Sequence, residues 1–386
     1  MLTRLSEATR TTSGGKAATL SLLLSHGLAV PHGFVVPSDV RPGRSGDRHA
    51  LHQAVAAALA QLGDPVVAVR SSALGEDSAE ASAAGQYESV IGVHGAEAVC
   101  QAIAECRHSA RTDRVSRYWA RTGGRSPRDS DMAVLVQPVI EAEASGVMFT
   151  PHHSGGPIRI ESAWGLGLGV VGGAIMPDAY EVAEDGTIDR RVGSKRLRID
   201  LDHVHGGVMT SAVSADKQSS LTLDNDTVAV VAELGRQIAE VCGGPQDIEW
   251  AVVGDAVWIL QARPITAALP VSPVLDPSVG IDVLRGTPGS HGTVTAAARI
   301  VSGPADFAAL RRGEIVVCAT TDPAWTPLFA VAAGVVTEIG GVLSHAAIVA
   351  REYGIPAVLG VDGAVTEIKD GAEIRLNGTA GTITRL

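Results

Sequence analysis

The sequence predicts an α/β (α+β) fold built from short strands that alternate with helices. Hydrophobic residues make up 45% of the 386-residue chain, aromatic residues only 3%, and 44 residues are glycine, which suits a mixed fold rich in small side chains. Towards the C-terminus, helix-like stretches separate four Val- and Ile-rich segments, Gly313–Cys318, Gly334–Thr337, Ala357–Leu359 and Glu373–Leu376. A chain of this length is sufficient for two or three domains.

Charge and hydropathy exclude several classes of function. The formal net charge of −11 argues against a general nucleic-acid binder, which needs a basic surface to displace counterions. No apolar run approaches the roughly 18 residues that span a bilayer, and the N-terminus lacks the pattern of a signal peptide. The four cysteines have no CxxC spacing, so neither a zinc site nor a disulfide framework is indicated. We therefore expect a cytoplasmic protein whose partners include neither a membrane nor a nucleic acid.

Two segments in the first quarter of the chain have residues that suit a phosphate site. Lys16 follows two glycines at the start of a helix-like stretch, although the spacing is not the Walker pattern. Arg70 lies in a strand-like segment that ends in Arg-Ser-Ser, and Gly85 and Ser89 follow after an acidic loop. A cationic strand end and a glycine beyond a loop can hold a polyphosphate from two sides. The alternative is an ordinary strand with a solvated turn.

The middle of the chain predicts an apolar slot and a glycine-spaced loop. The segments Leu135–Ile140, which contains Gln137, and Ser145–Thr150 are both strand-like, and such strands can form the walls of a purine site. The loop within Ile160–Gly169 has regularly spaced glycines. No acidic residue for a ribose follows it in a βαβ context, so we reject a dinucleotide-binding fold.

The most specific pattern before the C-terminal region is a predicted hairpin. Asp247–Trp250 lies on one strand and Ile259–Thr266 on the next, with a tight turn between them. Antiparallel pairing of these strands can bring Glu249, Gln261 and Arg263 to one site. Two oxygen ligands suit Mg²⁺, and a guanidinium suits phosphate. The alternative is a surface hairpin with an incidental charge pair.

One histidine stands where a phosphoryl group can be carried. His345 follows the glycine pair Gly340-Gly341 and begins an apolar, helix-like run, with Ser344 as the expected N-cap. The backbone N–H groups of the first turn and the positive end of the helix dipole favour a phosphate there. The alternative for an isolated histidine is a cap or a packed side chain.

The surroundings of His345 resemble a known family. The segments Thr320–Trp325, Ala333–Glu338 and Glu352–Val358, together with the histidine segment, are similar to the swivelling phosphohistidine domain of phosphoenolpyruvate synthase, pyruvate phosphate dikinase and rifampin phosphotransferase. The resemblance runs from residue 285 to 386 and includes Ser290-His291-Gly292, where the family more often has Ser-Pro-Gly. It implies that His345 is the catalytic nucleophile.

The preceding motifs resemble, in order and spacing, the ATP-grasp nucleotide-binding domain of the same family. That resemblance implies ATP and Mg²⁺ as cofactors, with Glu249 and Gln261 facing the metal and Lys195 as a further candidate. The residues implied to hold ATP are Lys16, Arg70, Gly85, Ser89, Gln137, Glu249, Gln261 and Arg263. Ser89 stands where the family usually has Thr, which keeps the hydroxyl, and Leu168 replaces a polar residue.

We therefore divide the chain into an ATP-grasp domain (1–266), a Pro-containing linker (267–284) and a phosphohistidine domain (285–386). Proline-containing linkers are stiff spacers with hinge points, which suits a carrier that must visit two places. We expect no large acceptor-binding domain between the two parts, because only the linker separates them.

The implied function is that of a dikinase-type phosphotransferase. ATP phosphorylates His345, which passes the phosphoryl group to a small hydroxylated or enolic acceptor, with AMP and phosphate released. One alternative is a phosphocarrier subunit that delivers the phosphoryl group to a separate acceptor-binding protein. A third interpretation, a nucleotide-binding protein that has lost turnover, is disfavoured by the intact set of site residues.

Overall fold

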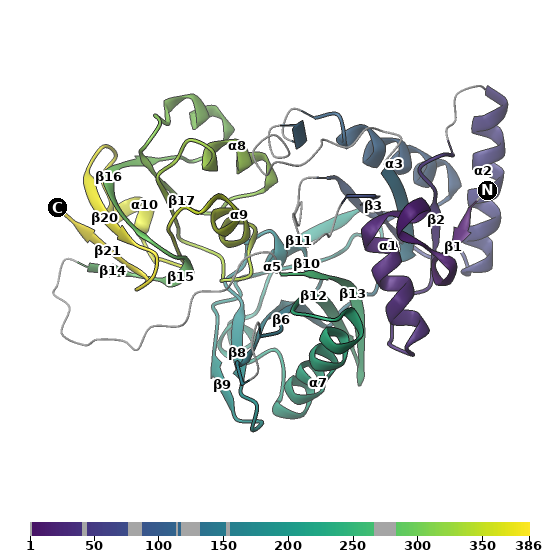
Figure 1. Cartoon of the computed structure of the whole chain (residues 1–386), viewed down its shortest axis with the longest axis horizontal. Coiled ribbons are helices and arrows are strands. Elements are labelled where there is room, and N and C mark those ends of the chain that lie inside the picture. The colour runs from purple at the N-terminus through teal and green to yellow at the C-terminus, as the bar shows by residue number, and fades with distance from the viewer. Residues whose placement is uncertain are drawn as a thin grey trace.

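The computed structural model describes residues 2–40, 45–75, 87–112, 115–116, 132–151, 155–265 and 283–386. Figure 1 shows the last of these ranges as a separate body on the left, joined to the rest of the molecule at the centre. The linker predicted over 267–284 lies outside the described residues except for its last two positions, and so does Gly85. In the part of the chain that the structure describes, no helix is long and apolar enough to cross a membrane.

The N-terminal part contains two antiparallel sheets and a separate hairpin. In spatial order, the five-stranded sheet is β1 (Thr3–Arg4), β2 (Phe34–Val36), β5 (Met132–Pro138), β3 (Val67–Ala73) and β4 (Ser89–Val93). The six-stranded sheet is β13 (Ala256–Pro264), β12 (Gln246–Val253), β6 (Ala144–Phe149), β7 (Ile158–Trp164), β8 (Asp178–Val182) and β9 (Ile188–Arg191). The hairpin is β10 (Leu197–Leu201) and β11 (Val208–Ala212).

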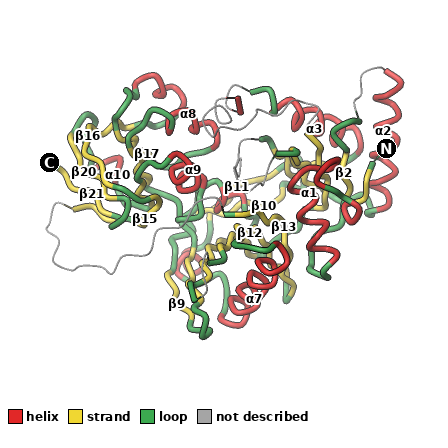
Figure 2. The backbone as a smooth tube through the Cα atoms, in the orientation of Figure 1, coloured by secondary structure: helices red, strands yellow, loops and turns green. Residues whose placement is uncertain are grey.

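Helices cover these sheets, as Figure 2 shows for α1, α3 and α7. Their bounds are α1 (Arg10–Ser25), α2 (Ser45–Gln61), α3 (Ala96–Ser109), α5 (Leu168–Val171), α6 (Ala215–Ser219) and α7 (Asn225–Cys242), with a 3₁₀ turn at Leu5–Glu7. Helices α2 and α3 bury one face of the five-stranded sheet. Helices α1 and α7 share a second core with the six-stranded sheet, and its central residue is the fully buried Trp250.

A kink at the start of α1 brings Lys16 beside the strand that contains Arg70. Gly14 has a φ of 81°, and a Cβ at this position would lie 2.0 Å from the carbonyl oxygen of Ser72 on β3. Only glycine tolerates both the left-handed backbone and the close approach. The Ser72 hydroxyl donates to the Ser13 carbonyl at 2.7 Å and accepts from the Ala17 N–H at 3.1 Å. The Gly-Gly-Lys motif is therefore fixed against β3.

The C-terminal part is a mixed eight-stranded sheet with helical segments on both faces. In spatial order its strands are β14 (Val283–Arg285), β21 (Thr382–Arg385), β20 (Glu373–Asn377), β16 (Thr293–Ile300), β17 (Ile315–Cys318), β18 (Gly334–Thr337), β19 (Ala357–Leu359) and β15 (Thr287–Ser290). Strands β16 to β19 are parallel. The helical segments are α8 (Thr326–Phe329), α9 (His345–Tyr353) and α10 (Ala364–Glu367), with 3₁₀ turns at Pro304–Ala309 and Pro323–Trp325.

The four predicted C-terminal strands are confirmed, and two of them have the predicted bounds. Alternate residues of β17, β18 and β19 point to opposite faces of the sheet, so each strand is buried on both sides. Ala347, Val349 and Ala350 of α9 pack on one face, and Gly354 in the left-handed conformation ends this helix. The sheet therefore presents the first residue of α9, His345, at one end of the domain.

Candidate active site

A cavity of about 530 Å³ lies between the two parts of the molecule. Strands from both N-terminal sheets form most of its wall, and the start of α9 and the Asp322–Ala324 turn close it from the other side. All the predicted site residues that the structure describes line this one cavity, namely Lys16, Arg70, Ser89, Gln137, Glu249, Gln261, Arg263 and His345. The structure thus brings together residues from seven separate sequence motifs.

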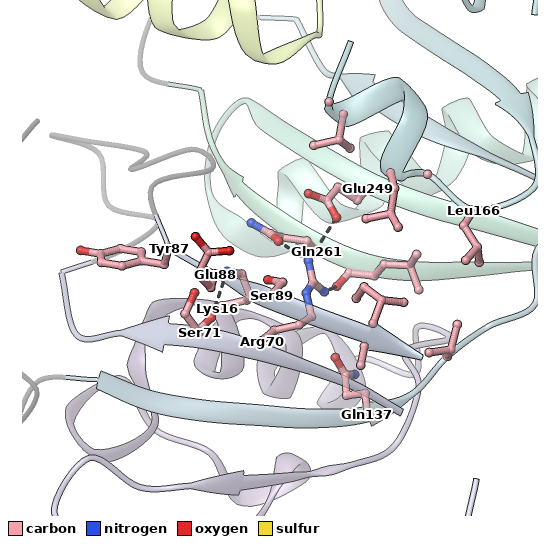
Figure 3. A pocket seen from close by; sticks show the side chains of 18 of the residues that line it. Lys16, Arg70, Ser71, Tyr87, Glu88, Ser89, Gln137, Leu166, Glu249 and Gln261 are labelled. Carbon is pink, nitrogen blue, oxygen red and sulfur yellow. Dashed lines mark hydrogen bonds and ion pairs between the residues drawn. The ribbon is translucent and has the colours of Figure 1, made fainter. Parts of the chain in front are cut away.

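The centre of the N-terminal wall is a charged cluster around Arg70. Its guanidinium donates to the Gln261 amide oxygen at 2.5 Å, to a Glu249 carboxylate oxygen at 3.1 Å and to the Leu260 carbonyl at 2.6 Å. Figure 3 shows Arg70 pointing from its strand towards Glu249 and Gln261. The predicted antiparallel hairpin is confirmed, and Glu249 and Gln261 are paired in register. The side-chain oxygens of Glu249 and Gln261 and the guanidinium of Arg70 therefore face the same point of the cavity.

Two further residues belong to the rim of the N-terminal wall. The Lys16 ammonium is buried and donates to the Ser71 carbonyl at 3.0 Å. The Gln137 amide donates to the Pro31 carbonyl at 2.6 Å, which fixes the side chain against the turn before β2. Apolar residues that include Ile91, Ile140 and Leu166 form the adjoining wall. This arrangement combines an apolar slot with cationic groups at its end.

Arg263 is held by a buried carboxylate. It forms an ion pair with Asp247, with nitrogen–oxygen distances of 2.8 and 2.7 Å, and both side chains are almost fully buried. Burial raises the pKa of the Asp247 carboxyl above its ordinary value, and the neighbouring guanidinium counters part of this effect. The pair orients Arg263 along the wall of the cavity, because the two strands place these residues opposite each other.

His345 is the first residue of α9 and is only 4% exposed. The Thr321 hydroxyl lies 3.4 Å from its Nδ1 atom and the Thr326 hydroxyl 3.4 Å from its Nε2 atom. Ser344 occupies the predicted N-cap position, but its hydroxyl donates to the Gly341 carbonyl at 2.8 Å instead of capping the helix. Two threonines from a different turn therefore flank the imidazole, and this fixes the plane of the ring.

The loop before His345 is docked on the far face of the six-stranded sheet. Leu343 is buried in an apolar cluster with Val147 and Phe149 of β6. The Glu161 carboxylate on β7 accepts the backbone N–H groups of Val342 at 2.8 Å and Leu343 at 3.3 Å. Burial raises the pKa of Glu161 to about 7, although these two bonds act in the opposite direction. The contact places the histidine inside the cavity.

Lys195 and Leu168, which were also named from the sequence, differ in their position relative to the cavity. Lys195 does not line the cavity; it is fully buried and forms an ion pair with Asp178, and it also donates to the Gly193 carbonyl at 2.8 Å. Leu168 does line the cavity, with 39% of its surface exposed. The wall is therefore apolar where the family usually has a polar residue.

The sequence matches the models of two known protein domains, and the first of them binds nucleotides. The family model described as "Pyruvate phosphate dikinase, AMP/ATP-binding domain" matches residues 48–271, which is more than half of the chain. The chain belongs to this family. The model described as "PEP-utilising enzyme, mobile domain" matches residues 310–381, the part that contains His345. The predicted order of a nucleotide-binding domain followed by a phosphohistidine-type mobile domain is thus confirmed.

Full-length relatives of the family extend beyond this chain. A protein named "Probable phosphoenolpyruvate synthase" from Methanothermobacter thermautotrophicus is 34% identical, covering 83% of this chain and 47% of its own length. The phosphoenolpyruvate synthase of Aeropyrum pernix is 30% identical, over 96% and 56% of the two chains. That of Escherichia coli is 34% identical, over 86% and 45%. The chain spans about half the length of the curated relatives it matches.

Several residues of the site were present in the sequence motifs without an assigned role. Thr321 lies in the Thr-Thr-Asp-Pro segment, Glu161 begins the glycine-spaced loop, and Arg351 ends the histidine segment. Their roles depend on contacts between segments far apart in the chain, such as the 181 residues that separate Glu161 from Val342. The strand that contains Glu161 also contains Arg159, so a charge in a strand-like segment gave no distinctive signal for Glu161.

Replacement of Gly341 should interfere with docking and leave the two domains folded. A Cβ at this position would lie 2.1 Å from a Glu161 carboxylate oxygen. We expect Gly341→Ala to slow labelling of His345 by ATP at least about tenfold, because small misplacements of reacting groups carry large kinetic costs. Gly303→Ala is the matched control, since a Cβ there meets nothing within 4 Å. If Gly341→Ala is labelled as fast as Gly303→Ala, the steric explanation is wrong.

The raised pKa of Glu161 predicts that docking depends on pH. In the docked structure the pKa is about 7, whereas a carboxyl that faces water has its ordinary value of 4.5. Protonation therefore favours the docked state, so docking should be strongest below pH 4.5 and weaken as the pH rises through 7. Small-angle X-ray scattering should show the radius of gyration increasing over this range. Glu161→Gln should flatten the dependence, and an unchanged profile in that variant would contradict the assignment.

Proposed function

We propose that this chain catalyses the ATP-dependent phosphorylation of His345 and carries the phosphoryl group to an acceptor. The observation that carries the proposal is that His345 and the predicted ATP-binding residues line one cavity. Membership of the pyruvate phosphate dikinase family supports ATP as the nucleotide. The relatives named phosphoenolpyruvate synthase support a dikinase-type reaction.

The cavity wall suits a nucleoside triphosphate. The apolar residues around Leu166 and Ile140 match the flat faces of a purine, and Lys16, Arg70 and Arg263 supply positive charge for the phosphates. The bonds from Arg70 to Glu249 and Gln261 hold its guanidinium in one place, so its positive charge has a fixed position in the cavity. Positioning and charge neutralisation account for most of the rate in phosphoryl transfer.

Glu249 and Gln261 fit a magnesium site. Both present oxygen atoms, and both reach the same guanidinium of Arg70, so their oxygens converge. Mg²⁺ is usually bound by one or two protein ligands plus phosphates and water, so two oxygen-bearing side chains are sufficient on the side of the protein. When bound, Mg²⁺ would neutralise charge on the phosphate oxygens.

The reaction proposed for His345 is an attack on the β-phosphorus of ATP. A nitrogen–phosphorus bond forms, the bond to the α-phosphate oxygen breaks, and AMP leaves with the electron pair. The γ-phosphoryl group is then lost to water as inorganic phosphate. Thr321 and Thr326 hold the imidazole ring, and its burial limits the access of water to the phosphorylated form.

The acceptor that we propose is a small hydroxylated or enolic molecule. The relatives that carry the name phosphoenolpyruvate synthase support this chemical class. The alternative is a phosphocarrier role in which His345 delivers the phosphoryl group to a separate acceptor-binding protein. Measuring AMP release with candidate small molecules, and then with a co-expressed partner, distinguishes the two. Turnover that requires the partner would exclude a self-sufficient enzyme.

We propose a cytoplasmic location for either role.

The central test is transfer of label from ATP to the histidine. Incubation with Mg²⁺ and ATP labelled in the β-phosphate should give acid-labile label on the protein and release AMP, and His345→Ala should abolish both. His32→Ala is a suitable control, because this histidine does not line the cavity. Label that survives in His345→Ala, or label that is absent from the unmodified protein, would refute the proposal.

The metal assignment predicts a specific change in magnesium dependence. Glu249→Gln should raise the Mg²⁺ concentration for half-maximal labelling at least about tenfold, an effect typical of losing even an outer partner of a metal. Glu233→Gln is the matched control, since Glu233 is exposed and pairs with Arg236 on the surface of α7. Chelation of Mg²⁺ should stop labelling in all variants. A Glu249→Gln protein with an unchanged Mg²⁺ requirement would show that this carboxylate is not a ligand.

A further inference from the structure

Arg351 connects the histidine loop to the body of its own domain. This residue lies on α9, the helix that begins with His345. Its Nη1 atom donates to the Val342 carbonyl at 2.8 Å and to the Gly289 carbonyl at 2.9 Å. Gly289 is on β15, the edge strand of the sheet. One guanidinium therefore ties the loop before His345 to a rigid strand.

The same guanidinium faces the N-terminal part of the molecule. Its central carbon lies 5.9 Å from the centroid of the Phe149 ring on β6, a distance typical of a cation–π contact. Phe149 is paired in register with Asp247 on β12. Asp247 and Glu161 are the acidic groups that act most strongly on Arg351, whose pKa burial lowers to about 10. Arg351 is thus a cation of the mobile domain that lies against Phe149 and near the carboxylates of Asp247 and Glu161.

The peptide group that joins Val342 to Leu343 is held from both sides. Its carbonyl, that of Val342, accepts from Arg351 at 2.8 Å, within the mobile domain, and its N–H, that of Leu343, donates to Glu161 at 3.3 Å, across the contact. Leu343, the next residue, is buried against Phe149 and Val147. A peptide held at both its polar groups cannot rotate without breaking a buried hydrogen bond, which is costly. The position of His345, three residues further on, follows from that of this peptide.

We propose that Arg351 is a positioning residue for the phosphorylation of His345 by ATP. It fixes the loop within the mobile domain and supplies the positive charge that offsets Glu161 and Asp247 when the domain docks. Without this cation, the buried Glu161 carboxylate would face the docked loop with less compensation, which is costly. Asp247 has its own cation, because it forms an ion pair with Arg263. Arg351 does not line the ATP cavity, so it acts through His345. This inference rests on the proposed phosphorylation of His345.

The test compares Arg351→Gln with Arg299→Gln. Arg299 lies on β16 of the same domain and pairs with Glu314 and Asp370, so its loss also removes ion pairs of an arginine, but at a site remote from the docked loop. In single-turnover labelling with β-labelled ATP, Arg351→Gln should lower the maximal rate at least about tenfold and leave the ATP concentration for half-maximal rate unchanged. Arg299→Gln should label at the rate of the unmodified protein.

The outcomes separate this inference from the proposed function. If the unmodified protein acquires no label, the proposed function fails. If it is labelled and Arg351→Gln is labelled equally fast, or Arg299→Gln is slowed as much, Arg351 has no positioning role. Near-ultraviolet circular dichroism checks folding of each variant. Should Arg351→Gln fail to fold, Arg351→Lys decides the question: it keeps the charge but not the planar donor group, and it should show an intermediate rate with an unchanged ATP dependence.

Discussion

The active cavity depends on one contact, the docking of a glycine-rich loop against a buried carboxylate. Glu161 accepts two backbone N–H groups of the loop, and Leu343 fills an apolar pocket beside it. The loop approaches so closely that a Cβ at position 341 would lie 2.1 Å from a Glu161 carboxylate oxygen. Because the histidine helix begins directly after this loop, the same contact brings His345 to the cavity that the N-terminal sheets form.

A contact of this kind suits a domain that must also leave. Permanent interfaces bury a large surface area, whereas one buried carboxylate and its hydrogen bonds bury little. Removing this carboxylate from water also costs free energy, which offsets part of the gain from the hydrogen bonds. The raised pKa of Glu161 is the sign of that cost. The apolar anchor is the Leu343 side chain, with the partly buried Val342 packed beside it. Docking can therefore be specific in position without being strong, which a carrier between two sites requires.

The N-terminal wall is organised by charge. Arg70 is paired with the two residues that fit Mg²⁺, and Arg263 is paired with Asp247. In both cases the pairing holds a guanidinium, whose charge is needed for a phosphate, in a defined place on a strand. Lys195, although equally buried, satisfies its charge on Asp178 away from the cavity. The glycine-containing motif around Lys195 therefore has a structural role, since the Lys195 ammonium also donates to the Gly193 carbonyl.

The sequence by itself determined everything that local patterning controls. The strands β17 to β20, the hairpin that pairs Glu249 with Gln261, and the helix that begins at His345 all follow from periodicity and turn residues over short ranges. Only the tertiary structure decided the partners of His345 and of its loop. Thr321, Thr326, Glu161 and Arg351 reach their places through packing between distant segments. Such contacts leave no periodic signal, because their energy depends on the burial and distance that the complete fold creates.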